Sequence, residues 1–131
     1  LQTLRAYIEA ETKDAELYRE LSKIAQNAEF RQLLLQFSDD EQLHADLFSS
    51  IYKKMTGKTY SPEIMKPVFT GSFFDILRER VIDESGDYRK YAEKYIDTQK
   101  NEALKDAYYR ARTDENVHAL RLLYMLSSEG K

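Results

Sequence analysis

The sequence predicts an all-α protein, a four-helix bundle of two antiparallel helical hairpins joined by a crossover loop. Three observations support this fold. Apolar residues recur at helical spacing along four stretches of the chain. The composition, with 42% hydrophobic and 33% charged residues but only four Gly and two Pro, is typical of a helical bundle. The two halves also repeat one pattern of residues. At 131 residues the chain can bury a core, and we expect a single domain over residues 1–131.

The first hairpin is expected over residues 1–56. Apolar residues at helical spacing predict its first helix over residues 4–25, and Glu11 interrupts the apolar stripe of that helix. Asn27 then marks a tight turn.

The second helix of this hairpin is predicted over residues 29–55, where the apolar stripe contains two polar residues, Glu41 and His44. Gly57 is a plausible end for this helix, because glycine adopts the left-handed conformation that ends many helices. Both prolines of the chain follow it, so residues 57–71 are expected to form the crossover loop.

The second hairpin is expected over residues 72–128. Its first helix is predicted over residues 72–98 and carries Glu84 on its apolar side. Gly86 lowers the helix propensity there, and we interpret it as room for a close neighbour or as a local distortion.

The last helix is predicted over residues 102–126, after a short connection near Asn101. Its apolar stripe contains Glu115 and His118. The second hairpin therefore repeats the first, with Glu on one helix and Glu-x-x-His on the other. The residues that repeat are Glu11 and Glu84, Asp14 and Asp87, Tyr18 and Tyr91, Asp40 and Asp114, Glu41 and Glu115, and His44 and His118.

These repeated residues have the chemistry of a metal site. Glu and His three positions apart point to the same side of a helix, so a carboxylate and an imidazole can bind one ion. The only two histidines of the chain both occur in this setting. The glutamates of each hairpin lie at similar distances from its turn, so that packing the hairpins brings them to one level. The expected ligands of the site are Glu11, Glu41, His44, Glu84, Glu115 and His118.

The number and type of ligands indicate two divalent cations. Four buried carboxylates would repel one another and lose their hydration, and two divalent cations would neutralise them. Hard carboxylates with one imidazole per metal favour iron or manganese, although zinc would also bind. The alternative interpretation is that each Glu-x-x-His pair lies on a solvated helix face.

At these residues the sequence resembles the ferritin-like di-iron carboxylate proteins, whose halves each carry Glu and Glu-x-x-His. Within that superfamily it is most similar to the rubrerythrins, which have a Tyr seven residues after the first-helix Glu, as Tyr18 and Tyr91 are here. The resemblance covers residues 4–125. It implies a ferritin-like fold, two iron ions, and bridging of the two metals by Glu41 and Glu115. It further implies that the remaining ligands are Glu11 with His44 on one metal, and Glu84 with His118 on the other.

The sequence departs from the rubrerythrins in two respects. They usually carry a rubredoxin-like domain with Cys-x-x-Cys pairs, whereas this chain has no cysteine, so its electron donor is expected to be an external rubredoxin-like protein or flavoprotein. Many also have another Glu one turn after the third-helix ligand, where this chain has Asp87. We keep Asp87 as an additional candidate ligand, although it and Asp14 fit better as surface residues or as residues beside the ligands.

Other side chains are expected to orient the ligands. A metal-binding imidazole usually donates its second N–H to a carboxylate. We expect His118 to donate to Asp40, and His44 to Asp114, across the bundle. Tyr18 and Tyr91 are candidates to donate to ligand carboxylates, the alternative being that they fill the core. The charged run at residues 78–80 is expected to be solvated surface.

The function implied by the resemblance is that of a non-haem di-iron oxidoreductase, a peroxidase that reduces hydrogen peroxide or dioxygen in the defence against oxidative stress. One alternative is a ferroxidase or iron-storage protein of the ferritin type. Another is a metal-binding interaction domain without turnover. Assembly size separates the first two, because iron storage needs a shell of many subunits.

The charge and composition of the chain limit its expected cellular location and its expected binding partners. A net charge of −3 without a basic stripe argues against binding to nucleic acid or to an anionic membrane surface. The absence of cysteine excludes disulfides, a thiol nucleophile and Cys-ligated metal sites. No apolar run approaches membrane-spanning length and no signal-peptide pattern is present, and we expect a cytoplasmic protein. The first residue is Leu1 rather than Met, which is consistent with a sequence trimmed at its start.

The length of the crossover bears on the oligomeric state. A connection between parallel helices must travel about 40 Å, the length of the second helix. Residues 57–71 reach that far only when nearly extended, at about 3.3 Å per residue. We expect a homodimer, and the tight crossover leaves domain swapping between two chains open.

Overall fold

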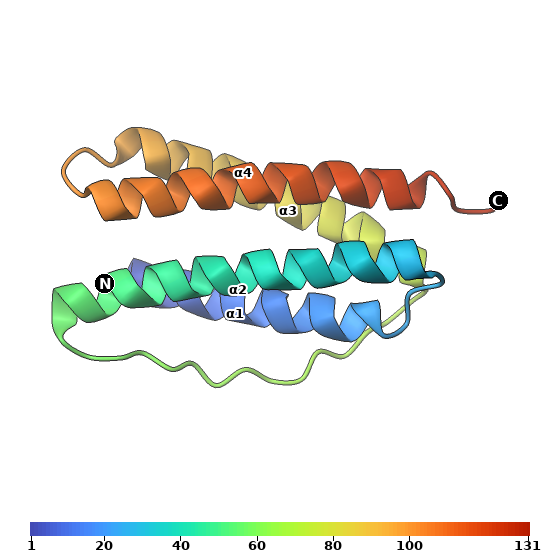
Figure 1. The fold of residues 1–131 in the computed structure, drawn as a ribbon, viewed down its shortest axis with the longest axis horizontal. Coiled ribbons are helices and arrows are strands. Elements are labelled where there is room, and N and C mark those ends of the chain that lie inside the picture. The colour runs from blue at the N-terminus through green and yellow to red at the C-terminus, as the bar shows by residue number, and fades with distance from the viewer.

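The computed structural model describes all 131 residues, Leu1–Lys131, and contains four α-helices and no strand. The helices α1 (Gln2–Ser22) and α2 (Ala28–Thr56) form one hairpin, and α3 (Phe73–Asp97) and α4 (Glu102–Leu126) form the other. Figure 1 shows the two hairpins lying side by side, both along the long direction of the molecule. The connection from α2 to α3 runs the length of the molecule. The predicted all-α four-helix bundle is confirmed.

Short side-chain caps determine where three of the helices begin. The side chains of Asn27 and Asn101 each accept a hydrogen bond from the backbone N–H three residues later, at 2.9 and 3.0 Å. Ser72 and Asp75 form a capping box at the start of α3. Gly57 ends α2 with a φ of 77°, a left-handed conformation that glycine adopts without strain. The expected helix end at Gly57 is therefore confirmed.

The crossover occupies the residues between Thr56 and Phe73 and has no regular secondary structure. It begins where α2 ends and returns to the opposite end of the bundle, so that α3 runs parallel to α2 (Figure 1). The extended path that the sequence required is the path observed. One chain closes its own bundle in this way.

The hairpins meet through their second helices. α1 packs against α2, α3 against α4, and α2 against α4, whereas α1 and α3 do not approach each other closely along their backbones. A cavity of about 590 Å³ lies between α1 and α3, and residues 68–70 of the crossover also line it. This cavity lies beside the level at which the candidate ligands gather, because Asp14 and Asp87 contribute to its wall.

The core consists of two apolar clusters with a polar layer between them. On each helix, the expected ligands fall between residues of the first cluster and residues of the second. The first cluster contains Leu4, Tyr7, Ile8, Phe48, Ile51, Tyr52, Tyr91, Ala107, Tyr108 and Ala111. The second contains Tyr18, Leu21, Phe30, Leu34, Phe37, Ile76, Leu77, Leu122 and Met125. The helices thus place every ligand candidate at mid-height, enclosed by apolar side chains on both sides.

None of the four helices is long and apolar enough to cross a bilayer. Each is amphipathic, and the apolar side faces the bundle interior.

Gly86 differs from its sequence interpretation. A Cβ built at this position meets no atom within 4 Å, so the glycine is not required by a close neighbour. α3 also continues without interruption from Phe73 to Asp97, so there is no break in the helix at this residue. Gly86 instead lines the open cavity between α1 and α3.

We therefore expect Gly86→Ala to stabilise the protein by about 1 kcal/mol, the difference in helix propensity between the two residues. Urea denaturation followed by circular dichroism would measure the change in the free energy of unfolding. A substitution that destabilises the protein would show that α3 needs the conformational freedom of glycine at this position.

Candidate metal centre

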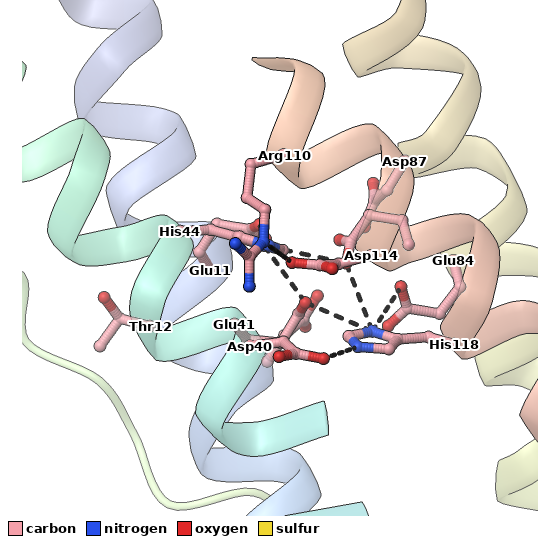
Figure 2. Close-up of polar contacts among 12 residues, drawn as sticks. Glu11, Thr12, Asp40, Glu41, His44, Glu84, Asp87, Arg110, Asp114 and His118 are labelled. Carbon is pink, nitrogen blue, oxygen red and sulfur yellow. Dashed lines mark hydrogen bonds and ion pairs between the residues drawn. The ribbon is translucent and has the colours of Figure 1, made fainter. Parts of the chain in front are cut away.

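The six expected ligands meet at one level in the centre of the bundle. Two come from first helices, Glu11 on α1 and Glu84 on α3, and four from the Glu-x-x-His pairs of α2 and α4. None of the six is more than 1% exposed. Figure 2 labels five of them, which converge from the four helices: Glu11, Glu41, His44, Glu84 and His118.

The six residues form two groups that share two members. Glu11, Glu41, His44 and Glu115 bring one ligand atom each to within 4.8 Å of one another. Glu41, Glu84, Glu115 and His118 form the second group at the same spacing. A carboxylate common to both groups can bridge two cations. The two residues in this position are Glu41 and Glu115, which the resemblance had implied as the bridges.

Both imidazoles turn the same ring nitrogen toward the carboxylates. Nδ1 of His44 lies 2.8 Å from Glu11 Oε1, and Nδ1 of His118 lies 3.4 and 3.5 Å from Glu115 Oε1 and Glu41 Oε1. The other nitrogen of each ring, Nε2, points outward. The inward Nδ1 atoms are therefore the ones positioned to bind a metal.

Aspartates of the opposite hairpin hold the outer nitrogens. His44 Nε2 lies 2.6 Å from Asp114 Oδ2, and His118 Nε2 lies 2.8 Å from Asp40 Oδ2 (Figure 2). An Nε2–H that donates to a carboxylate leaves the lone pair on Nδ1, which is the tautomer a metal requires. Arg110 on α4 donates to Asp114 at 2.9 Å and so holds that carboxylate in place. The expected pairing of each histidine with an aspartate across the bundle is observed.

The buried polar atoms of the site lack hydrogen-bond partners. Most of the buried side-chain oxygen and nitrogen atoms without a partner in the whole protein belong to it. Such atoms cost free energy when no group compensates their lost hydration, and cations between them would do so. The donor set, four carboxylates and two imidazoles, therefore fits two divalent metal ions. The unpartnered atoms are Glu11 Oε2, both Oε atoms of Glu41 and Glu115, Glu84 Oε2 and His118 Nδ1.

Burial and mutual repulsion shift the protonation of the ligands. Burial first, and then the neighbouring carboxylates, raise the pKa of Glu41 to about 7. Burial opposes the charged form of His118, but its hydrogen bond to Asp40 and the carboxylate of Glu84, 3.6 Å from Nδ1, outweigh it and raise the pKa of His118 to about 9. The folded chain thus holds protons in the place where metal ions would bind.

The two tyrosines of the repeat are not equivalent. Tyr18 donates to Glu84 Oε1 at 2.5 Å, as expected for a residue that orients a ligand. The hydroxyl of Tyr91 is buried without a hydrogen-bond partner, and its ring packs among Tyr7, Phe48 and Tyr108. Donation to a ligand carboxylate is thus seen for Tyr18 only, and Tyr91 serves as a core residue.

Arg80 is a site residue that sequence reasoning missed. We expected residues 78–80 to be solvated surface, but Arg80 is only 7% exposed. Its guanidinium lies 3.1 Å from Tyr18 Oη, 3.1 Å from Asp14 Oδ2 and 3.4 Å from Glu84 Oε1. The signal was its position one turn before Glu84 on the same side of the helix, where a buried carboxylate needs a cation.

Asp14 and Asp87 lie beside the ligands. Asp14 pairs with Arg80, and Asp87 lies 3.4 Å from the Lys90 ammonium. With Glu11 they form a further group of three carboxylates within 4.8 Å. Asp87, expected next to the third-helix ligand, is therefore grouped with Glu11 and not with Glu84. It belongs to neither of the two groups that contain a histidine.

The histidine–aspartate pairs lead to a first prediction for this site. Asp40→Asn is expected to weaken metal binding by roughly tenfold to a hundredfold, because an amide does not fix the proton of His118 on Nε2, with the lone pair on Nδ1, as a carboxylate does. Calorimetric titration with Zn²⁺ would measure the affinity of each variant for the metal. Asp39→Asn, one residue earlier and exposed, is the matched control and should bind like the unmodified protein. Equal affinities in the two variants would contradict the orienting role.

A second prediction concerns pH. A group whose pKa is raised by folding contributes stability at low pH that is lost as the pH rises through its folded pKa. Because folding raises the pKa of Glu41 from 4.5 to about 7 and that of His118 from 6.5 to about 9, the metal-free protein should lose stability between about pH 4.5 and pH 9. Metal ions replace these protons, so Zn²⁺ should raise the melting temperature more at high pH. Thermal denaturation with and without chelator checks both trends, and a pH-independent Zn²⁺ effect would contradict this account.

The family to which comparison with known proteins assigns this chain agrees with the geometry of the candidate metal centre. The family model described as Rubrerythrin matches residues 2–76, which comprise α1, α2, the crossover and the start of α3. The chain is 29% identical over 126 residues to the uncharacterized protein YhjR of Bacillus subtilis (strain 168), covering 96% of this chain and 86% of that protein. No solved structure gives a significant match. With the family match extending over more than half of its length, this chain belongs to the rubrerythrin family.

Proposed function

We propose that this protein is a di-iron oxidoreductase that reduces hydrogen peroxide or dioxygen. The observation that carries the proposal is the convergence of unpartnered carboxylate and imidazole atoms at the centre of the bundle. Membership of the rubrerythrin family supports iron as the metal. Manganese and zinc are substitutes that the same ligands would accept.

Each part of the site has a role in this function. Bound iron would supply the electrons and the Lewis acidity for the reduction. Glu41 and Glu115, common to both ligand groups, would bridge the metals, and each imidazole would bind one of them through Nδ1. Six protein groups do not saturate two metal ions, which leaves room for a small substrate. The two apolar clusters keep bulk water away from the site above and below.

The cavity between α1 and α3 supplies a route from solvent. Asp14 and Asp87 line it, and both have carboxylate oxygens within 4.8 Å of a Glu11 ligand atom. A molecule as small as hydrogen peroxide would reach the metal centre from this cavity by passing a single ligand, Glu11.

The reaction also needs an electron source outside the chain. The sequence contains no cysteine, and we propose a rubredoxin-like protein or a flavoprotein as the external donor. We further propose that the protein acts as a cytoplasmic homodimer in the response to oxidative stress.

The proposal is tested by metal analysis and peroxide turnover. The purified protein should contain two iron ions per chain, and the anaerobic ferrous form should change its optical spectrum when peroxide is added. With a chemical reductant, it should then consume many equivalents of peroxide. Glu41→Gln should reduce turnover at least a hundredfold, because it alters a ligand of both metals, whereas Glu93→Gln on the exposed side of α3 should not.

Two results would contradict the proposal. Iron binding without peroxide consumption under any reductant would indicate a binding domain without turnover. Assembly into a large shell that accumulates iron beyond two ions per chain would favour a ferritin-type storage protein.

A further inference from the structure

We propose that the two metal positions are unequal, and that the position formed by Glu11 and His44 fills before the position formed by Glu84 and His118. Arg80 and Tyr18 act as positioning residues that create the difference through Glu84. The inference rests on the proposed metal centre and extends it to the order of metal loading.

Glu84 is the ligand whose charge is partly neutralised by the protein itself. Its Oε1 accepts the 2.5 Å hydrogen bond from Tyr18 and lies 3.4 Å from the Arg80 guanidinium. Only Oε2 remains without a partner. A metal at this position would meet one free carboxylate oxygen and a buried cation close by.

Glu11 has no such neighbours. The only hydrogen-bonding partner of its carboxylate is Nδ1 of His44, which is itself a ligand atom and would turn to the metal. Its Oε2 is free. Both oxygens of Glu11 therefore become available to a metal, and no buried guanidinium competes for them.

The difference comes from one pair of positions in the internal repeat. The offset that superposes Glu11 on Glu84 places Tyr7 on Arg80. Tyr7 is a core residue with its ring 5.3 Å from that of Tyr91, and it carries no charge. On that side the ammonium of Lys90 lies over the rings of Tyr7 and Tyr91, at 5.0 and 4.5 Å, and pairs with Asp87.

A cation beside a ligand lowers the affinity of that ligand for a metal in two ways. It repels the incoming ion, and it stabilises the carboxylate in the absence of metal. Hydrogen bonds to charged groups shift equilibria by about tenfold to a hundredfold. We therefore expect the affinities of the two positions to differ by at least about tenfold, beyond the weakening that any second cation meets at shared carboxylates.

The two histidines of the chain allow each position to be observed separately. His44 belongs to one group and His118 to the other, so ¹⁵N-labelled histidine yields one reporter ring per metal position. Zn²⁺ is the probe, added in steps against a competing chelator, and a His118→Asn variant assigns the signals. The ring of His44 should shift with the first equivalent of Zn²⁺ and the ring of His118 with the second.

Variants test whether Arg80 causes the order. Arg80→Met should strengthen Zn²⁺ binding at His118 about tenfold and bring the two transitions together, and Arg80→Lys should keep them apart. The double variant Arg80→Met/Asp14→Asn does the same without leaving Asp14 unpaired. Lys90→Met removes the cation of the other half and is the matched control, expected to leave the order unchanged. Tyr18→Phe should bring the Zn²⁺ transitions of His44 and His118 closer together, and it tests the inference even if the Arg80 variants do not fold.

The outcomes are distinguishable. Simultaneous shifts of both rings in the unmodified protein, or His118 shifting first, would overturn the inference while supporting the metal centre. Weaker Zn²⁺ binding at His118 in a folded Arg80→Met variant would overturn it also, because it would show that Arg80 supports the ligand. If neither ring responds to Zn²⁺, the metal centre itself is rejected, and the inference with it.

Discussion

The constraint on which this structure depends is the burial of four carboxylates and two imidazoles in the middle of an apolar bundle. An isolated buried carboxylate is costly, and several together repel one another. The chain lowers this cost by protonation in the metal-free state, as the raised pKa values of Glu41 and His118 show. Metal ions would remove the cost more completely. Metal binding would therefore be coupled to folding through the same six side chains.

The polar layer also joins the two hairpins. His44 pairs with Asp114 and His118 with Asp40, and each pair connects α2 to α4. Tyr18 on α1 reaches Glu84 on α3. These contacts cross the interface at the polar level between the two core clusters. The site is thus part of what aligns one hairpin with the other, and its geometry and the register of the bundle depend on each other.

The two halves of the internal repeat have the same types of candidate ligand, but the residues around those ligands differ. Both halves supply one Glu and one Glu-x-x-His, so two groups of candidate ligands with the same composition result. Around them, Arg80 and Tyr18 contact Glu84, whereas Tyr7 and Tyr91 pack as apolar core near Glu11. A repeated sequence can therefore carry two sites of unlike electrostatics. For a pair of metals with distinct roles, such a difference is a means of setting the order in which they bind.

Much of this protein could be predicted from local patterns. Helical periodicity, Gly57 and the proline-containing crossover predict four helices within a few residues of their observed ends, since these signals act over one or two turns. The spacing of Glu41 and His44, repeated at Glu115 and His118, placed the candidate ligands on the buried side of their helices because helix geometry relates spacing to direction.

Contacts between residues far apart in the sequence could not be predicted from such local patterns. In the sequence Arg80 is one charge in a charged run, and only its side-chain contacts with Asp14 and Tyr18 of α1 show that it is enclosed together with Glu84. Likewise, Tyr18 and Tyr91 are equivalent in the sequence, and their different partners come from unlike residues on the helix opposite each. Local spacing determines which way a side chain points. What it meets there depends on residues many positions away, which packing alone brings together.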